Sequence, residues 1–363
     1  MEKAGHRRAV VLAALAGVAA LAGILALAAG WTGPRPAAGS NERMHVRTRA
    51  GRPGRFETSF QVMGTDARFE VAAPDARAAE RLLAPAVAHT RQVEARMSTY
   101  RPDSEVSRLN RHGHPGPVPV SEETEAVLLR AADVSRRAGG AFDVTYAPLR
   151  TLWRTAAARG VPPTPDQIER VRALVGWEKL RVEPGGARFA VPGMEIDLGG
   201  IAKGYAIDRA VEALQAAGAA SGLVDIGGDL RTFGTPPASG HWAIRVRRAP
   251  DVAEEWVLRV GACAVTTSGD YARWFRVGDR HYSHIIDPRN GRPVGNVPSA
   301  TVVAPDATLA DGLATAISVL GPAEGVRLVD ALPGAECMIL ERRPDGGVEV
   351  HMSTGFALLL EGS

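Results

Sequence analysis

The pattern of apolar and polar side chains divides the first half of the chain into distinct segments. Residues 56–72 contain stretches with the two-residue period of strands, and residues 76–97 carry apolar side chains at the three- and four-residue spacing of a helix. A second helix is predicted over residues 121–138, with Ser121 as its N-cap. Between these helices, residues 97–110 are polar and rich in hydroxyl groups, which predicts a loop that reaches a ligand.

The second half of the chain mixes helical and strand-like segments without a regular βαβ rhythm or an internal repeat. This mixture predicts an α+β protein, built of mixed α/β layers, rather than a doubly wound parallel sheet. The predicted helices cover residues 151–175 with a proline-rich break at 161–165, residues 201–217, a segment that begins at Asp311, and residues 324–331. The predicted strands form a hairpin at 181–191 and cover residues 222–226, 242–246, 255–260 and two C-terminal segments.

Residues 195–218 form the stretch around which we expect the chain to be organised. The pattern predicts the end of a strand at 195–198, a turn at Gly199 and Gly200, and then a helix that Gly218 ends. The first N–H groups of a helix lack intrahelical partners and attract anions, so this corner suits a phosphate, with Lys203 close by. The glycine spacing matches no established phosphate-binding motif, and a corner that simply packs tightly remains the alternative.

The N-terminal region predicts a membrane segment followed by a tether. Residues 1–8 are basic, and residues 9–31 contain no charged side chain and are long enough to cross a bilayer as a helix. This segment is either a retained signal anchor or a signal cleaved after residues 26–28, and its long apolar core favours retention. Residues 32–55 predict a flexible basic linker, and residues 56–363 a folded domain. We expect a single-pass protein of the cytoplasmic membrane with its folded domain outside the cytoplasm.

The distribution of charged residues along the chain narrows the possible partners. Nine of the 43 Lys and Arg residues but two of the 40 acidic residues lie in residues 1–55, so the predicted folded domain is slightly acidic. A slightly acidic domain with few aromatic residues argues against nucleic acid as a partner.

The two cysteines, Cys263 and Cys337, are compatible with a disulfide or with two buried thiols, and we favour thiols.

Asp311 and Thr315 are the residues that most resemble metal ligands. They stand four residues apart on a predicted helix, which puts a carboxylate and a hydroxyl on one face, one turn apart. Both are hard oxygen donors of the kind that Mg²⁺ prefers. In the alternative interpretation, Asp311 caps the helix and Thr315 bonds back to a carbonyl of the preceding turn.

Seven short motifs follow one another along the chain. They are Met63-Gly64-Thr65, Ser98-Thr99-Tyr100, Ala141-Phe142-Asp143-Val144, Asp197-Leu198-Gly199-Gly200-Ile201-Ala202-Lys203-Gly204, Asp225-Ile226-Gly227-Gly228-Asp229, His284-Ile285-Ile286-Asp287-Pro288 and Ala310-Asp311-Gly312-Leu313-Ala314-Thr315. This ordered set resembles the ApbE family, and the resemblance extends over residues 56–360. It implies a T-fold-like single catalytic domain with the activity of an FAD:protein FMN transferase. Such an enzyme cleaves the pyrophosphate of its substrate FAD and joins FMN through a phosphoester to a threonine of a target flavoprotein, releasing AMP.

The resemblance also implies roles for individual residues. A Mg²⁺ ion is expected at Asp311, Thr315 and the backbone carbonyl of Gly200, whereas a direct role for Thr308 is not expected. His284 either orients the pyrophosphate or acts as general base, and orientation is favoured. The implied FAD contacts are Met63 and Tyr100 on the flavin, Ala141, Phe142 and Asp143 in the surrounding pocket, Asp197 on the ribose or adenine, Lys203, and the backbone of Ile285.

Three activities remain open at this point. The implied partners are target proteins with an FMN-acceptor threonine, such as FMN-binding domains and subunits of electron-transfer complexes. A metal-dependent FAD pyrophosphatase would use the same site with water as the acceptor, and a non-catalytic protein would only bind FAD. The presence of both Asp311 and Thr315 favours a catalyst over a binding protein.

Overall fold

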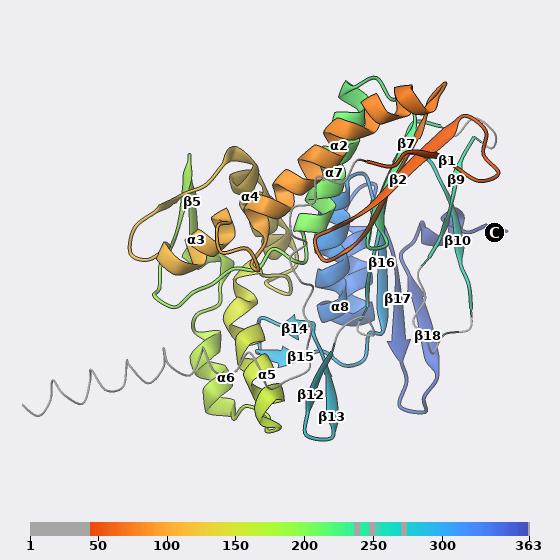
Figure 1. The fold of residues 1–363 in the computed structure, drawn as a ribbon. Helices are drawn as coiled ribbons and strands as arrows, with labels where there is room; N and C mark the ends of the chain where they lie inside the picture. Colours follow the sequence, from red (N-terminus) through yellow and green to blue (C-terminus); the bar gives the residue numbers. More distant parts are fainter. Residues whose placement is uncertain (1–43, 236–239, 247–251, 253, 270–273, 362–363) are drawn as a thin grey trace, which may run out of the picture.

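The computed structural model describes residues 44–235, 240–246, 252, 254–269 and 274–361, and its centre is a nine-stranded antiparallel sheet (Figure 1). Apolar side chains from its strands enter two separate hydrophobic clusters, so the sheet has two buried faces. The strands, in spatial order, are β1 (Arg47–Thr48), β2 (Arg55–Val62), β3 (Thr65–Ala72), β7 (Gly222–Ile226), β8 (Asp229–Phe233), β11 (Ala264–Gly269), β16 (Ser299–Ala304), β17 (Glu336–Arg342) and β18 (Val348–Met352).

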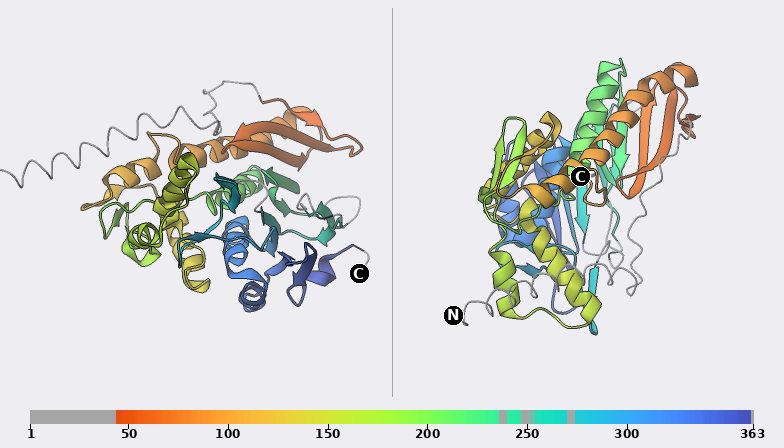
Figure 2. Two further views of the ribbon diagram at one scale, coloured as in Figure 1. Left: turned by 90° about the horizontal axis from the view of Figure 1, so that it is seen from below. Right: turned by 60° about the vertical axis from the view of Figure 1, so that its left-hand side comes forward.

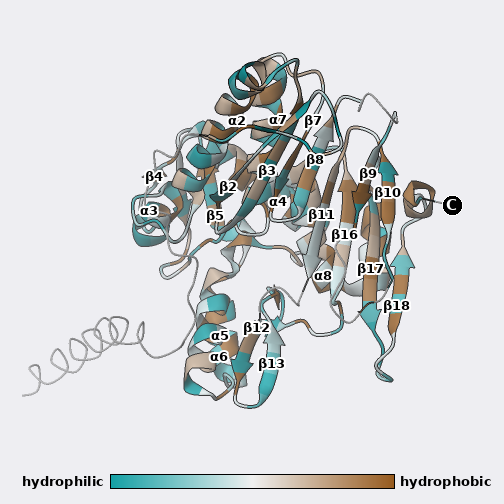
Figure 3. Cartoon of the chain, turned by 45° about the vertical axis from the view of Figure 1, so that its right-hand side comes forward, coloured by the Kyte–Doolittle hydropathy of each residue, from teal (hydrophilic) through white to brown (hydrophobic). Residues whose placement is uncertain are grey.

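Three helices form a layer on one face of the sheet (Figures 1 and 2). They are α2 (Ala76–Met97), α7 (Ala202–Ala216) and α8 (Ala307–Asp330), and each presents a fully buried apolar stripe to the strands. The smaller hairpin of β9 (Trp242–Arg245) and β10 (Val257–Val260) packs with the 3₁₀ turn η4 (Phe356–Leu359) on the opposite face. The inner strand β16 is therefore buried at every position, and it is largely apolar in Figure 3.

A second group of shorter elements lies beside the N-terminal ends of α7 and α8 (Figure 1, left and bottom). Part of this group has its own small core, in which Trp153 and Ile168 pack against Val277 and Ile286. The elements are α3 (Glu105–His112), β4 (Val118–Pro119), α4 (Glu122–Arg137), η2 (Val144–Tyr146), α5 (Ala147–Arg159), α6 (Pro165–Arg172), η3 (Trp177–Lys179), β5 (Leu180–Glu183), β6 (Gly186–Phe189), β12 (Trp274–Val277), β13 (Arg280–Ser283), β14 (Ile286–Asp287) and β15 (Arg292–Pro293).

The structure confirms the α+β class and most of the predicted elements. Helix α2 has the predicted bounds, and the hydroxyl of Ser121 accepts a hydrogen bond from the N–H of Thr124 at the start of α4. The final predicted helix continues α8 beyond a kink at Gly321, whose φ of 75° breaks the helical geometry. Both cysteines have free thiols, as favoured, and burial raises the pKa of Cys263 to about 11 and that of Cys337 to about 12.

Two predicted segments have the wrong type of structure. Residues 97–110 are a loop only as far as Ser104, which caps α3, because the apolar side chains of Val106 and Leu109 are enough to bury one face of this short helix. Residues 195–198 belong to no strand. The side chain of Asn110 takes the place of a neighbouring strand: it accepts from the N–H of Ile196 at 2.8 Å and donates to its carbonyl at 2.9 Å.

The described part of the predicted basic linker is attached to the sheet. Strand β1 pairs with β2, and Arg47 and Arg49 bind the buried carboxylate of Glu57 at 2.8 and 3.0 Å. Arg55 donates to Glu70 at 2.9 Å. Ordered structure thus begins before Phe56, because two buried glutamates fix arginines that the composition assigned to a flexible tether.

The predicted membrane segment at residues 9–31 lies outside the described residues. Within the described ranges, one helix, α8, is long and apolar enough to pass a test for a membrane span based on length and composition. Its residues Leu313, Ala314 and Ile317 are fully buried, and it packs against β11, β16 and β17. In this structure α8 is a core helix.

The contact between α7 and α8 yields a prediction about Gly204. A Cβ atom at Gly204 would lie 2.1 Å from the carbonyl oxygen of Ala307 and 2.9 Å from Cβ of Asp311, so Gly204→Ala forces the helices apart. We expect the free energy of unfolding to fall by about 3 kcal/mol or more, the upper range for overpacked sites. Chemical denaturation of the purified variant measures this loss. Gly295→Ala is the matched control, because nothing lies within 4 Å of its Cβ position, and equal stability of the two variants would contradict the prediction.

Candidate functional site

The predicted glycine corner is held by side chains on both sides. Asp197 accepts from the N–H of Gly199 at 2.7 Å, which closes the turn, and its other oxygen pairs with Arg150 of α5. Asp197 is buried, and each of its two carboxylate oxygens has a partner within the chain. In this structure Asp197 organises the corner, and its predicted contact with ribose or adenine stays a prediction.

The anion at the N-terminus of α7 is a side chain of the protein itself. Ile201 at the N-cap has no side chain that can accept a hydrogen bond, and the N–H of Gly204 in the first turn donates to Oδ2 of Asp311 at 3.0 Å. The close approach is possible because Gly204 has no Cβ. The N–H of Gly204 thus binds the carboxylate of Asp311, and the phosphate expected at the first N–H groups of this helix stays a prediction.

Asp311 lies inside α8 and does not cap it. The helix begins at Ala307, and its N-cap is Asp306, which accepts from the N–H of Leu309 at 2.7 Å. The interpretation of Asp311 as a cap, and the predicted start of the helix there, are wrong because Asp306 five residues earlier has the capping geometry. Asp311 is 2% exposed. Burial raises its pKa, and the neighbouring Lys203 and the N–H of Gly204 partly oppose that effect.

Thr315 lies next to the corner, one helical turn after Asp311. Its Oγ1 is 3.1 Å from the position that a Cβ on Gly200 would take. Among the hydrogen bonds of the described residues, none returns from this hydroxyl to its own helix, in contrast to Ser318, which donates to Ala314. The alternative of a back-bonded threonine therefore has no support here.

The three predicted metal-binding residues come from adjacent parts of the α7–α8 contact: Asp311 lies against Gly204, and Thr315, one turn later on α8, lies against Gly200. Their carboxylate, hydroxyl and backbone oxygens are the donor chemistry that Mg²⁺ requires. The carboxylate lies in a desolvated position where a cation stabilises its charged form. The residues present fit a small, hard divalent cation.

Lys203 supplies positive charge to the same place. Its ammonium group pairs with Asp229 at the start of β8 and lies 3.8 Å from Oδ1 of Asp311. Asp229 is 2% exposed and also accepts from the N–H of Thr267 at 3.3 Å. Lys203 is therefore fixed between two buried carboxylates, and its predicted contact with FAD is not tested by this arrangement.

Asp143 and its neighbours support the corner from the side. Ala141 and Phe142 are buried, and the ring of Phe142 is 3.2 Å from the Cβ position of Gly200. Asp143 accepts from Thr145 and from the N–H of Trp177, and burial raises its pKa against the effect of these hydrogen bonds. The three residues predicted to line the FAD pocket thus pack within the protein. Only Asp143 reaches the wall of a cavity.

That cavity has a volume of about 310 Å³ and lies beside Asp143, away from Asp311 and Lys203. Three arginines line it, and each already binds a carboxylate: Arg136 binds Asp133, Arg172 binds Glu169, and Arg289 binds Asp287. We therefore place the candidate site at the α7–α8 contact, where the donor set is, and not in this cavity.

Met63 and Tyr100 are the predicted flavin contacts, and they differ in strain and exposure. Met63 has a φ of 53° in the two-residue turn between β2 and β3, a conformation that disfavours a side chain, and its N–H donates to Glu94 at 2.6 Å. Such strain is typical of functional positions. Tyr100 is 48% exposed in the loop after α2, so part of its side chain is accessible to a ligand.

His284 and Ile285 lie between two hairpins, directly after β13. His284 is half-buried. Ile285 donates to the hydroxyl of Ser283 at 3.1 Å and accepts from the N–H of Val294 at 3.0 Å, so both of its backbone groups already have partners. If Ile285 contacts FAD through its backbone, as predicted, its N–H or its carbonyl must bind FAD in addition to its present partner. The turn that follows is held by Asp287, which accepts from Arg289 and Asn290.

Four residues of this region had no predicted structural role: Asn110, Arg150, Asp208 and Asp229. Asn110 and Arg150 contact the corner from elements that lie far from it in the sequence, and no local pattern marks them. Asp208 and Asp229 did carry a signal. Asp208 follows Gly204 by one helical turn, and Asp229 ends one of the seven motifs.

The antiparallel sheet, its helix layer and the oxygen-rich corner define a domain of the flavin transferase class. The structure superposes on the flavin transferase ApbE from Vibrio cholerae with a TM-score of 0.74 and 31% identity, covering 84% of this chain and 99% of that one. The apo flavinyl transferase ApbE from Pseudomonas stutzeri gives a TM-score of 0.75 at 29% identity, covering 89% and 99%. The mixed α/β fold is therefore that of known flavin transferases.

The chain belongs to the ApbE family, whose model matches residues 63–339. A relative from Vibrio cholerae named FAD:protein FMN transferase is 36% identical over 271 residues, which cover 73% of this chain and 80% of the relative. A relative of the same name from Haemophilus influenzae is 32% identical over 282 residues, covering 75% and 81%.

Proposed function

We propose that this chain is an FAD:protein FMN transferase. The observation that carries the proposal is the buried carboxylate of Asp311, joined to the glycine corner beside the hydroxyl of Thr315, in a member of the ApbE family. The relatives that match over most of the chain have this activity in their names.

In the proposed reaction, the hydroxyl oxygen of an acceptor threonine attacks the FMN-side phosphorus of FAD. A new O–P bond forms, the P–O bond to the bridging oxygen breaks, and AMP leaves with that oxygen. The hydroxyl proton passes to a base or to water. Because the nucleophile comes from the partner protein, the chain itself needs to bind, orient and neutralise the pyrophosphate.

The residues at the corner would divide these tasks. Asp311, Thr315 and the backbone of Gly200 would hold Mg²⁺, which when bound supplies positive charge that stabilises the pyrophosphate and the developing charge on the leaving group. Lys203 adds a second, fixed positive charge, kept in place by Asp229. His284 orients the pyrophosphate or accepts the threonine proton.

We also propose that the protein is anchored in the cytoplasmic membrane by residues 9–31, with its catalytic domain outside the cytoplasm. The apolar segment and the basic residues 1–8 support this proposal. Target flavoproteins with an FMN-acceptor threonine would then be extracytoplasmic domains of electron-transfer complexes.

Mass spectrometry of an acceptor protein tests the transferase directly. The full-length chain, FAD and Mg²⁺ are incubated with an FMN-binding domain that carries an acceptor threonine, and we expect the mass of FMN to be added to that threonine. EDTA and Asp311→Ala should each abolish the addition, while circular dichroism of the variant stays unchanged. FMN and AMP free in solution without an adduct would establish a pyrophosphatase instead, and intact FAD would establish a binding protein.

Tyr100 provides a test of flavin binding that does not depend on turnover. If its exposed ring stacks on FAD, Tyr100→Ala should weaken FAD binding by about 1–3 kcal/mol, the usual range for stacking on an aromatic ring, and Tyr100→Phe should retain it. Quenching of flavin fluorescence measures the affinity. An unchanged affinity in the alanine variant would remove Tyr100 from the site.

Cell fractionation tests the anchor. The full-length chain should remain in the membrane fraction after washing with alkaline carbonate, and its folded domain should be digested by protease added to intact spheroplasts. A chain without residues 1–31 should stay soluble. If expression of the full-length chain instead gives a protein in the soluble fraction whose N-terminus follows residue 28, the segment is a cleaved signal.

A further inference from the structure

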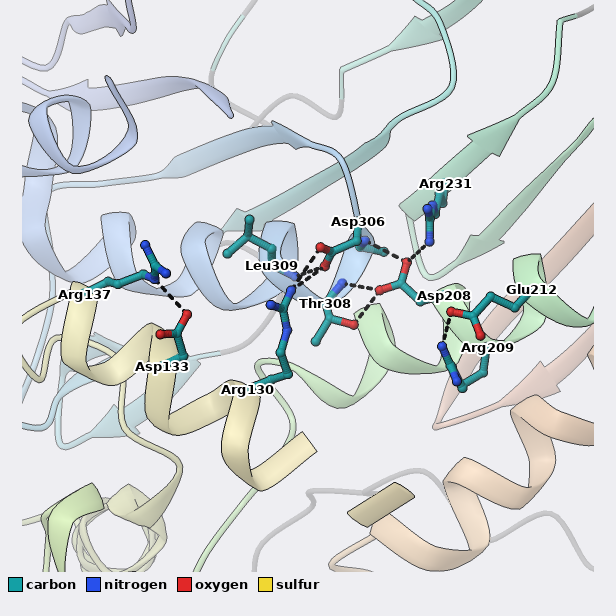
Figure 4. Close-up of polar contacts among 11 residues, drawn as sticks. Arg130, Asp133, Arg137, Asp208, Arg209, Glu212, Arg231, Asp306, Thr308 and Leu309 are labelled. Atoms are coloured by element: carbon teal, nitrogen blue, oxygen red, sulfur yellow. Dashed lines mark hydrogen bonds and ion pairs between the residues drawn. The ribbon is translucent and has the colours of Figure 1, made fainter. Parts of the chain in front are cut away.

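Asp208 joins the two helices that carry the site. It lies on α7 and is 5% exposed, and its carboxylate points to the first turn of α8 (Figure 4). It accepts from the N–H of Ala307 at 2.9 Å, from the N–H of Thr308 at 2.8 Å, and from the hydroxyl of Thr308. Arg231 of β8 donates to it from the other side at 2.7 Å.

The contact completes the hydrogen bonding at the N-terminus of α8. The first N–H groups of a helix have no intrahelical partner. Here Asp208 accepts from the first two, and Asp306, the N-cap, accepts from the third, that of Leu309. Asp306 lies on the same chain segment as α8 and is held by Arg130 of α4 at 3.0 Å, whereas Asp208 reaches across from another helix.

The two helices cap each other. Asp311 of α8 accepts from the first turn of α7 through the N–H of Gly204, and Asp208 of α7 accepts from the first turn of α8. Both carboxylates are buried and lie at the positive end of the partner helix, where a negative charge is favoured. Sliding of one helix along the other would break both contacts.

These contacts belong to one register between the corner and α8. Every fourth residue from 200 to 208, in the corner and α7, contacts a residue on α8, and these α8 residues are also spaced by about four. The residue numbers on α8 fall as those on α7 rise. The pairs are Gly200 with Thr315, Gly204 with Asp311, and Asp208 with Ala307 and Thr308. The first two pairs contain the proposed metal-binding residues, and the third holds their spacing without touching them.

We propose that Asp208 is a positioning residue of the active site, which fixes the register that brings Asp311 and Thr315 to Gly200. The inference rests on the proposed function for the identity of the site. Loss of the Asp208 contacts would leave the corner and α8 folded but allow their spacing to vary, so the oxygen donors would no longer be held at the distances that a small cation demands.

Binding of Mn²⁺, a paramagnetic substitute for Mg²⁺, tests the inference without turnover. Electron paramagnetic resonance of free Mn²⁺, titrated with the full-length chain, gives the dissociation constant, and Asp311→Ala identifies the part of the binding that belongs to this site. We expect Asp208→Asn to weaken that part at least tenfold. The amide presents N–H groups to donors and leaves Arg231 without its carboxylate.

Two further variants separate positioning from capping and from charge. Asp306→Ala removes the N-cap of the same helix but no contact with α7, so it should lower thermal stability and leave the Mn²⁺ affinity within about twofold. Thr308→Val removes one hydrogen bond to Asp208 without changing the charge, and we expect it to weaken Mn²⁺ binding about threefold. It also serves if Asp208→Asn does not fold.

The outcomes are distinct. Equal weakening by Asp306→Ala would reduce Asp208 to a helix cap, and an effect of Asp208→Asn without any effect of Thr308→Val would reduce it to a charge; either result overturns the inference. The inference is also overturned if no part of the Mn²⁺ binding is lost in the Asp311→Ala variant. Failure of the proposed function alone would instead be seen as normal Mn²⁺ binding with no FMN transfer by the unaltered chain.

Discussion

The structure depends on a hydrogen bond that only a glycine permits. Gly204 brings the backbone of α7 against α8, and its N–H binds a carboxylate that has almost no contact with solvent. A buried carboxylate is costly unless it is paired, and here the compensation comes from a helix end, from Lys203 and, in the proposed enzyme, from a cation. The same arrangement that packs the helices thus leaves a charged oxygen at the corner.

The sheet makes this arrangement stable. Helices α7 and α8 pack against neighbouring strands of one antiparallel sheet, and the hairpin of β9 and β10 covers its other face, so the strands define where both helices lie. The shorter elements contribute by different means. Arg150, Asn110 and Phe142 reach the corner from α5, α3 and the segment before η2, and none of them belongs to the sheet. The site is therefore a helix pair held by the sheet, to which two shorter helices and one connecting segment add side chains.

Elements with a long periodic pattern could be predicted from the sequence, and those defined by distant partners could not. Helix α2 repeats its apolar residues over six turns, and α4 begins with a recognisable cap, so both follow from local rules. The segment 195–198 has the composition of a strand, but its partner is the side chain of Asn110, 86 residues away from Ile196. Asp311 and Thr315 were found because their spacing is itself a helical property, whereas Asp208 gains its meaning only from α8, 99 residues later.

The two edge strands of the sheet affect the tendency of the protein to aggregate with other chains. Open strand edges invite further strands to pair, which leads to aggregation. Here one edge is β1, a strand of two residues in which Arg47, together with Arg49 directly after it, binds Glu57. The other edge, β18, carries Glu349 and His351 next to Glu341 and Arg343. A neighbouring chain that tried to extend the sheet would have to desolvate these charges. At the β1 edge, the ionic contacts that would oppose such pairing are the same ones that tie residues 47–49 to the domain.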